Sequence, residues 1–220
     1  MRFTSGRAAR GAIHLRVITI VDYDAGNLRS VKRACDRVGI DAVLSKDPDA
    51  VARAERVIFP GVGAAKSAMD TLTRTGLGDG IREAHRRGTP ILGICLGTQI
   101  VLDESEEGDV RCLGLIPGRT RRFRIADARL KVPHIGWNDV RVERAHPLLA
   151  GLEPGDEFYF VHSFFPAPDA ERVCATADYG GPFCCALGKD NLFATQFHPE
   201  KSGPLGLALL ERFRSWEGTC

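Results

Sequence analysis

PILGICLGTQ, residues 90–99, is the stretch that decides the fold. Its first half, Pro90–Ile94, is a short apolar run typical of a fully buried strand. Glycines at 93 and 97 flank Cys95 with the spacing of a nucleophile elbow, a sharp turn that leads from a strand into a helix. Such a turn strains the backbone of its central residue and needs small neighbours. The sequence therefore predicts a buried strand, a tight turn at Cys95 and a helix directly after it.

Upstream of this stretch, apolar runs alternate with amphipathic segments. We expect strands at Arg16–Asp22, Asp41–Lys46 and Arg56–Phe59, and helices at Asn27–Gly39, Ala64–Thr73 and Asp79–Arg87. Pro60-Gly61 is expected to stop the third strand. Repeated strand–helix–strand units predict an α/β fold, with a mostly parallel open sheet and helices on both faces.

Downstream of this stretch, most of the predicted elements are strands, and we expect them to add antiparallel strands to the sheet. They are expected at Phe158–Phe165, Arg172–Asp178, Phe183–Leu187 and Leu192–Phe197, with a hairpin turn at Gly188–Asn191 and a closing helix at Ser202–Trp216. We expect one domain over residues 16–220. Residues 1–15 carry basic residues but no apolar stretch, and we interpret them as a disordered or mis-started leader, with a transit peptide as the alternative.

Composition excludes several classes of protein. A formal net charge of +2 gives no field for nucleic acid, and no apolar run is long enough to cross a bilayer. The basic run Arg119–Arg124 is interpreted as a solvated face or a contact to an acidic partner, rather than a nucleic-acid patch. The seven cysteines form no CxxC pair, which favours reduced thiols in a cytoplasmic protein. Zinc spacings, GxGxxG and P-loop motifs are absent, so we expect no metal and no cofactor.

Cys95 is the candidate nucleophile. The turn lifts its sulfur to the start of a helix, where the partial positive charge favours the thiolate. The backbone N–H of Leu96 is then free to face a developing oxyanion. A second such donor is expected from the loop Pro60–Gly63, with Val62 favoured and Gly63 next. Taken alone, Cys95 can equally be a buried cysteine and Pro60–Gly63 an ordinary glycine-rich turn.

A nucleophilic cysteine needs a base and a group that orients the base. His198 is the candidate base because it follows a predicted strand and precedes Pro199, which ends that strand. Glu200 lies two residues on and can reach the far ring nitrogen. A surface His-Pro turn is the alternative. His85 and His146 are interpreted as a solvated helix residue and a loop residue.

Several motifs occur together and in a fixed order. They are VDYDAGNLRSV (Val21–Val31), FPGVGA (Phe59–Ala64), GICLGTQ (Gly93–Gln99), GLIPGR (Gly114–Arg119), PHIGWN (Pro133–Asn138), FVHS (Phe160–Ser163) and ATQFHPEKSG (Ala194–Gly203). In this combination the chain resembles the class I, triad-type glutamine amidotransferases, which are flavodoxin-like. More narrowly, it is similar to the glutaminase subunits of imidazole glycerol phosphate synthase from histidine biosynthesis.

The resemblance implies a reaction and a set of roles. Cys95 attacks the side-chain amide of glutamine, His198 moves the proton, Glu200 orients His198, and a glutamyl thioester is then hydrolysed. Val62 and Leu96 supply oxyanion N–H groups. The substrate's amino-acid end is held by Gly63, Gln99, His162 and Ser163.

The resemblance also implies a partner. Ammonia passes to a separate (β/α)8-barrel cyclase in a heterodimer, giving imidazole glycerol phosphate and aminoimidazole carboxamide ribotide. Asn27, Trp137 and Lys201 are the expected partner-facing residues. Three alternatives stay open: a glutaminase that serves another acceptor, a non-catalytic regulatory subunit with the same fold, and a cysteine peptidase.

Overall fold

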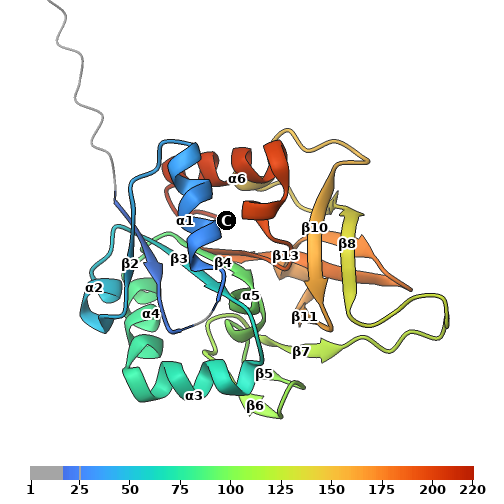
Figure 1. The fold of residues 1–220 in the computed structure, drawn as a ribbon, viewed down its shortest axis with the longest axis horizontal. Coiled ribbons are helices and arrows are strands. Elements are labelled where there is room, and N and C mark those ends of the chain that lie inside the picture. Colours follow the sequence, from blue (N-terminus) through green and yellow to red (C-terminus); the bar gives the residue numbers. More distant parts are fainter. Residues whose placement is uncertain (1–16, 25) are drawn as a thin grey trace, which may run out of the picture.

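The computed structural model describes residues 17–24 and 26–220, so the expected leader lies outside the described residues. Its centre is an eight-stranded sheet in the order β2-β1-β3-β4-β14-β13-β12-β9 (Figure 1). The first five strands are parallel: β2 (Ala42–Ser45), β1 (Ile18–Val21), β3 (Arg56–Gly61), β4 (Ile91–Cys95) and β14 (Leu192–Thr195). Three antiparallel strands extend one side: β13 (Pro182–Lys189), β12 (Val173–Asp178) and β9 (Arg141–Val142). The predicted α/β fold with a mostly parallel sheet and later antiparallel strands is confirmed.

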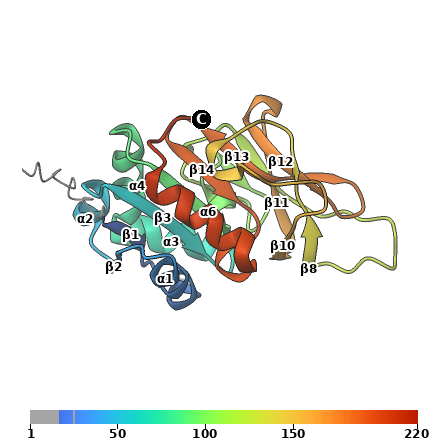
Figure 2. The same ribbon diagram turned by 90° about the horizontal axis from the view of Figure 1, so that it is seen from above.

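Helices cover both faces of this sheet, and residue alternation along the strands explains why. On one face, Ile18, Ile20 and Ile58 pack against α1 (Leu28–Arg37) and α6 (Gly203–Ser215). On the other, the neighbouring strand residues Val57 and Phe59 pack against α3 (Ala65–Thr75), α4 (Leu77–Arg86) and the short α5 (Leu96–Ile100). Figure 2 shows α1 and α6 side by side across the strands. Successive strand residues point to opposite faces, so each buried strand serves two cores.

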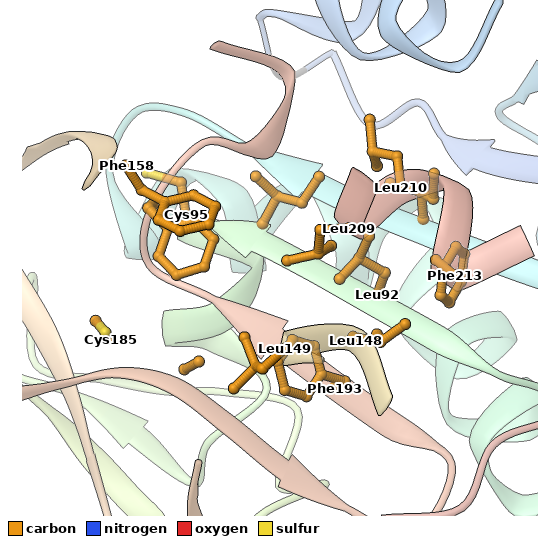
Figure 3. Packing of buried hydrophobic residues seen from close by; sticks show 14 of the residues in the cluster. Leu92, Cys95, Leu148, Leu149, Phe158, Cys185, Phe193, Leu209, Leu210 and Phe213 are labelled. Atoms are coloured by element: carbon orange, nitrogen blue, oxygen red, sulfur yellow. The ribbon is translucent and has the colours of Figure 1, made fainter. Parts of the chain in front are cut away.

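The core on the α1 and α6 side reaches the predicted elbow. Figure 3 shows Leu209, Leu210 and Phe213 of α6 near Leu92 of β4, with Cys95 at the end of the same apolar cluster. These α6 side chains are at most 1% exposed. Their packing fixes the strand whose last residue is Cys95.

Two predictions about the first half need correction. β3 continues through Pro60 to Gly61, whereas we expected Pro60-Gly61 to stop it. Val57 N–H bonds to Pro90 O on the β4 side, so Pro60 points toward β1, where pairing with β3 ends at Ile20–Ile58. The missing N–H of Pro60 therefore costs no ladder bond. The short helix α2 (Pro48–Ala52), capped by Asp47, was missed.

The second half forms two small additional sheets. β10 (Glu157–His162) pairs with β8 (His134–Asp139), while β11 (Phe164–Pro168) joins β7 (Gly118–Arg122), β5 (Glu104–Ser105) and β6 (Val110–Arg111). The predicted single strand Phe158–Phe165 is therefore wrong. The chain leaves one sheet and enters another at Ser163, whose carbonyl accepts the N–H of Phe123. Among the described residues, short 3-10 turns lie at Pro147–Leu149, Ala170–Arg172 and Pro199–Lys201.

Two histidines are less exposed than predicted. His146 is 5% exposed and stacks on Phe193, with ring centroids 4.2 Å apart, instead of lying in an open loop. His85 is half-buried, with a buried Nε2, because α4 packs beside the β13–β14 turn. All seven cysteines are free thiols, and six of them are buried. Among the described residues, no helix has the length and apolarity to cross a membrane.

Candidate active site

Cys95 sits in the strained turn that its flanking glycines predict. It ends β4 and precedes α5 with φ 55° and ψ −106°, a backbone region that residues with side chains rarely adopt. A Cβ on Gly97 would lie 2.0 Å from the Phe59 carbonyl oxygen, so only glycine fits there. The surrounding sheet and α5 hold this turn in place. The result is a nearly buried sulfur, on a residue 6% exposed, at the carboxyl end of a central strand.

His198 and Glu200 form a buried pair. The Nδ1 of His198 lies 2.7 Å from Oε1 of Glu200, and their side chains are 1% and 0% exposed. Because the carboxylate accepts, Nδ1 donates, and Nε2 is left for another task. This Nε2 is buried and is the ring nitrogen left to interact with the Cys95 sulfur.

The charges around His198 favour its protonated form. Burial lowers its pKa, but interactions with the Cys95 sulfur and with Glu200 outweigh burial and raise the pKa to about 10. The arrangement provides a sulfur that can attack a carbonyl carbon and a protonated imidazole that can then give its proton to a leaving group.

Asn27, predicted as a partner-facing residue, contacts the His198–Glu200 pair. Its Nδ2 donates a hydrogen bond to Oε1 of Glu200, the oxygen that His198 also uses. Asn27 is half-buried at the start of α1, with φ 77°. The side chain therefore points inward to the carboxylate. No local pattern indicates this contact, because 173 residues separate its two partners.

A cavity of about 330 Å³ opens beside the sulfur. Its lining includes the predicted residues Val62, Gly63, Cys95, Gln99, His162, Ser163 and His198. These come from the segments after β3 and β14, from the end of β4 and the adjoining α5, and from the β10–β11 junction, so the site lies at the carboxyl ends of parallel strands. Leu96 does not line the cavity. Its side chain is 2% exposed and packs in the core below the turn.

Glu107 also lines this cavity and was missed. It is half-buried, and its Oε2 accepts the N–H of Ala65 at 2.7 Å, which caps the start of α3. The surrounding sequence DESEEGD reads as a solvated acidic run, so no local pattern singles out one carboxylate. A carboxylate on the cavity wall is suited to bind an ammonium group.

His162 lines the cavity with an uncharged imidazole. Burial lowers its pKa to about 3, and its Nδ1 donates to the Phe164 carbonyl at 2.8 Å. Its Nε2 therefore accepts, and it takes a hydrogen bond from Nδ1 of His134 at 3.1 Å. His134 is likewise kept neutral, because burial lowers its pKa to about 4. The pair ties β8 to the wall of the cavity.

The other two predicted partner-facing residues are exposed and close to one another. Trp137 of β8 is 52% exposed, and its ring centroid lies 6.2 Å from that of Tyr159. The Lys201 Nζ lies 5.6 Å from the same Tyr159 ring. The Tyr159 carbonyl accepts the N–H of His198, so this surface adjoins the candidate base. Tyr159 was not predicted from the sequence.

A larger cavity of about 510 Å³ lies between β9, β12 and residues 152–155. Its lining includes no cysteine and no histidine, so it offers no nucleophile–base pair. No cluster of three or more metal-ligating side chains occurs in the part of the chain that the structure describes.

The fold, the elbow and the His198–Glu200 pair together place a candidate cysteine nucleophile beside a candidate base at the carboxyl ends of the sheet. The family model of class-I glutamine amidotransferases matches residues 19–215, and the chain belongs to this family. The chain is 50% identical over 205 residues to the imidazole glycerol phosphate synthase subunit HisH of Nitratidesulfovibrio vulgaris strain Hildenborough, covering 91% of this chain and 96% of the relative. It is 46% identical to the same subunit of Chromobacterium violaceum, covering 91% and 98%. The predicted resemblance to this subunit is confirmed.

Solved structures support the fold. The structure of PurLQS from Thermotoga maritima superposes with a TM-score of 0.68 at 19% identity, covering 90% of this chain and 97% of that one. A glutamine amidotransferase crystal structure gives 0.69 at 21% identity, covering 89% and 98%. At such identities the likeness shows a shared fold and carries no information on substrates.

Proposed function

We propose that this protein hydrolyses glutamine through a thioester on Cys95 and supplies the ammonia for imidazole glycerol phosphate synthesis in histidine biosynthesis. The observation that carries the proposal is the joint placement of Cys95 and the His198–Glu200 pair at one cavity. The proposal is also supported by the sequence, since this chain is about half identical to a HisH subunit over nearly its whole length.

The reaction uses the thiolate–imidazolium pair. The Cys95 sulfur attacks the side-chain amide carbon, forming a C–S bond and a tetrahedral oxyanion. The imidazolium of His198 gives its proton to the amide nitrogen, the C–N bond breaks, and ammonia leaves. His198, now neutral, takes a proton from water, whose oxygen attacks the thioester carbon. The C–S bond then breaks, which releases glutamate and restores the pair.

The residues that line the cavity are suited to bind the amino-acid end of glutamine. Glu107 binds the α-ammonium group, while Gln99, Gly63, His162 and Ser163 contact the remaining polar atoms of the amino-acid end. The backbone N–H groups of Val62 and Leu96 receive the oxyanion. Leu96 can do so although its side chain is buried, because its N–H begins α5 directly after the nucleophile.

The acceptor is a separate (β/α)8-barrel cyclase that forms a heterodimer with this chain. Support comes from the relatives, which are named as subunits of a synthase. Exposed Ile135, Trp137 and Lys201 supply the docking surface next to the active site. Of the basic run, Arg119 and Arg124 lie near Glu104 and Glu106, so this segment contributes a partly neutralised rim. We further propose residues 16–220 as the amidotransferase domain, in a cytoplasmic protein.

Ammonia release from glutamine tests the function, with the chain alone and then with a cognate barrel cyclase and its nucleotide ligand. We expect activity to rise steeply with the partner and to vanish in Cys95→Ala. Activity that depends on Cys95 but ignores the partner would point to another acceptor enzyme. No glutamine consumption in either condition would mean that the fold serves binding, and the proposal would be wrong.

A further inference from the structure

Gln196 is a buried amide at the sulfur that the proposed mechanism does not use. It follows the last residue of β14, next to β4 in the sheet, and it is 0% exposed. Its Nε2 lies 3.6 Å from the Sγ of Cys95, within hydrogen-bonding reach of sulfur. An amide presents a donor at one end and an acceptor at the other, so its effect on the sulfur depends on which end faces it.

Neighbouring groups decide that orientation. The Phe164 carbonyl can only accept, and Nε2 of Gln99 lies 2.9 Å from it, so this end of Gln99 is the donor. The same Nε2 donates to Oε1 of Gln196 at 2.9 Å. The oxygen of Gln196 is thereby committed to Gln99, and its NH2 group faces the sulfur.

The start of this chain of hydrogen bonds is itself held in place. The Phe164 carbonyl also accepts Nδ1–H of His162 at 2.8 Å, and His162 in turn accepts from His134. The backbone carbonyl of Gln99 accepts the hydroxyl of Thr120 at 2.9 Å. Each of these side chains is at most 5% exposed, so water does not compete for the bonds.

We propose that Gln196 is a catalytic residue that donates an N–H to the Cys95 sulfur and stabilises its thiolate. This inference rests on the proposed glutaminase function. A hydrogen bond to a charged acceptor is about twice as strong as one to a neutral acceptor. The sulfur is negative before attack and again when the C–S bond of the thioester breaks, and it is neutral in between. Gln196 therefore favours thiolate formation and assists sulfur as the leaving group when glutamate is released.

Gln196→Met tests the donor, because methionine has a similar length but no N–H. The readout is the rate of Cys95 alkylation by iodoacetamide against pH, followed by mass spectrometry of the Cys95 peptide. We expect the pH midpoint to rise by about one unit or more and kcat for glutamine to fall by roughly 10- to 100-fold. Gln196→Glu is the second variant, since its oxygen can still accept from Gln99 while its carboxylate opposes the thiolate, and it should raise the midpoint as well.

Asn191→Leu is the matched control. Asn191 is a buried amide just before the other end of β14, and it donates to the carbonyls of His85 and Thr89. Its loss should lower stability without moving the alkylation midpoint. An unchanged midpoint in folded Gln196→Met or Gln196→Glu would overturn the inference. Alkylation needs no glutamine, so a raised midpoint in protein without glutaminase activity would support the role of Gln196 and reject only the proposed function.

Discussion

Acid should destabilise this protein well above the pH at which carboxylates titrate, and His146 offers the cleanest test. Its ring stacks on Phe193, contacts Trp216 and accepts the N–H of Leu148 through Nδ1 at 3.2 Å. Burial, reinforced by the nearby charge of Arg144, lowers its pKa from 6.5 to about 4. Between pH 6.5 and pH 4, His146 is therefore protonated in the unfolded chain and neutral in the folded chain.

The sign and size of the effect follow from this difference. Where the unfolded state binds more protons, the free energy of unfolding falls as pH falls. Between pH 7 and pH 5, one histidine with its pKa lowered this far reduces the free energy of unfolding by about 2 kcal/mol. Burial lowers the pKa of His134 to about 4 and that of His162 to about 3, so each has a similar effect. Together, the three histidines reduce the free energy of unfolding by about 5 to 6 kcal/mol between pH 7 and pH 5. His198 offsets about 1 kcal/mol of this loss, because its raised pKa keeps it protonated in the folded state at pH 7, whereas the unfolded chain takes up that proton only as the pH falls through 6.5.

His146→Asn separates the titration from the packing. Asparagine can accept the Leu148 N–H through Oδ1, as the imidazole does, but it carries no titrating group. Urea unfolding followed by tryptophan fluorescence at pH 7 and pH 5 gives the free energy of unfolding at each pH. The variant should be less stable at pH 7 but should lose about 2 kcal/mol less than the wild type on going to pH 5. His85→Asn, at a half-buried site, should flatten the pH dependence less.

The wild type and His146→Asn could instead lose the same free energy between the two pH values. The folded state would then accept a proton on His146 as easily as the unfolded chain does. That result would refute the reasoning from burial.

Three further predictions concern the elbow and the triad. Glu200→Gln should lower kcat by about two to four orders of magnitude, because a neutral amide stabilises the imidazolium of His198 less, while a circular-dichroism melt should show a folded protein. Histidine side-chain NMR should place the pKa of His198 near 10, and Cys95→Ala should bring it down, since the sulfur makes the largest contribution that raises it; an unchanged value would contradict the ion pair. Gly97→Ala should cost about 1 kcal/mol or more and distort the turn, because its Cβ would meet the Phe59 carbonyl at 2.0 Å, so a variant with wild-type thermal stability and activity would argue against this geometry.

Much of the candidate site could be predicted from residues that are neighbours in the sequence. The glycines beside Cys95 and the Pro after His198 act within a few residues, and a strained turn or a strand end can be inferred from such neighbours. The pairing of His198 with Glu200 was within reach because the two residues are two positions apart. Of the residues that line the cavity, Gln99, His162 and Ser163 were named through the resemblance to known motifs and not through periodicity.

Predictions failed where pairing partners, and not local propensity, decide the structure. Phe158–Phe165 is mostly apolar or aromatic, which suits a single strand, yet β10 and β11 belong to different sheets because β8 and β7 come from separate segments. Pro60 continues a strand because its neighbour on one side has already ended. His146 is buried because the C-terminal Trp216 packs against it from a distant part of the chain.

By itself, the sequence determined the alternation of strands and helices, the turn at Cys95 and the chemical identity of the triad, since these depend on residues close along the chain. Only the tertiary structure decided that Asn27 points inward to Glu200, that Glu107 faces the cavity and that Gln196 turns its NH2 group to the sulfur. Asn27 and Gln196 are separated from their partners by 173 and 101 residues. Contacts of this kind depend on strand order and on which end of a buried amide its neighbours leave free, and neither leaves a periodic trace in the sequence.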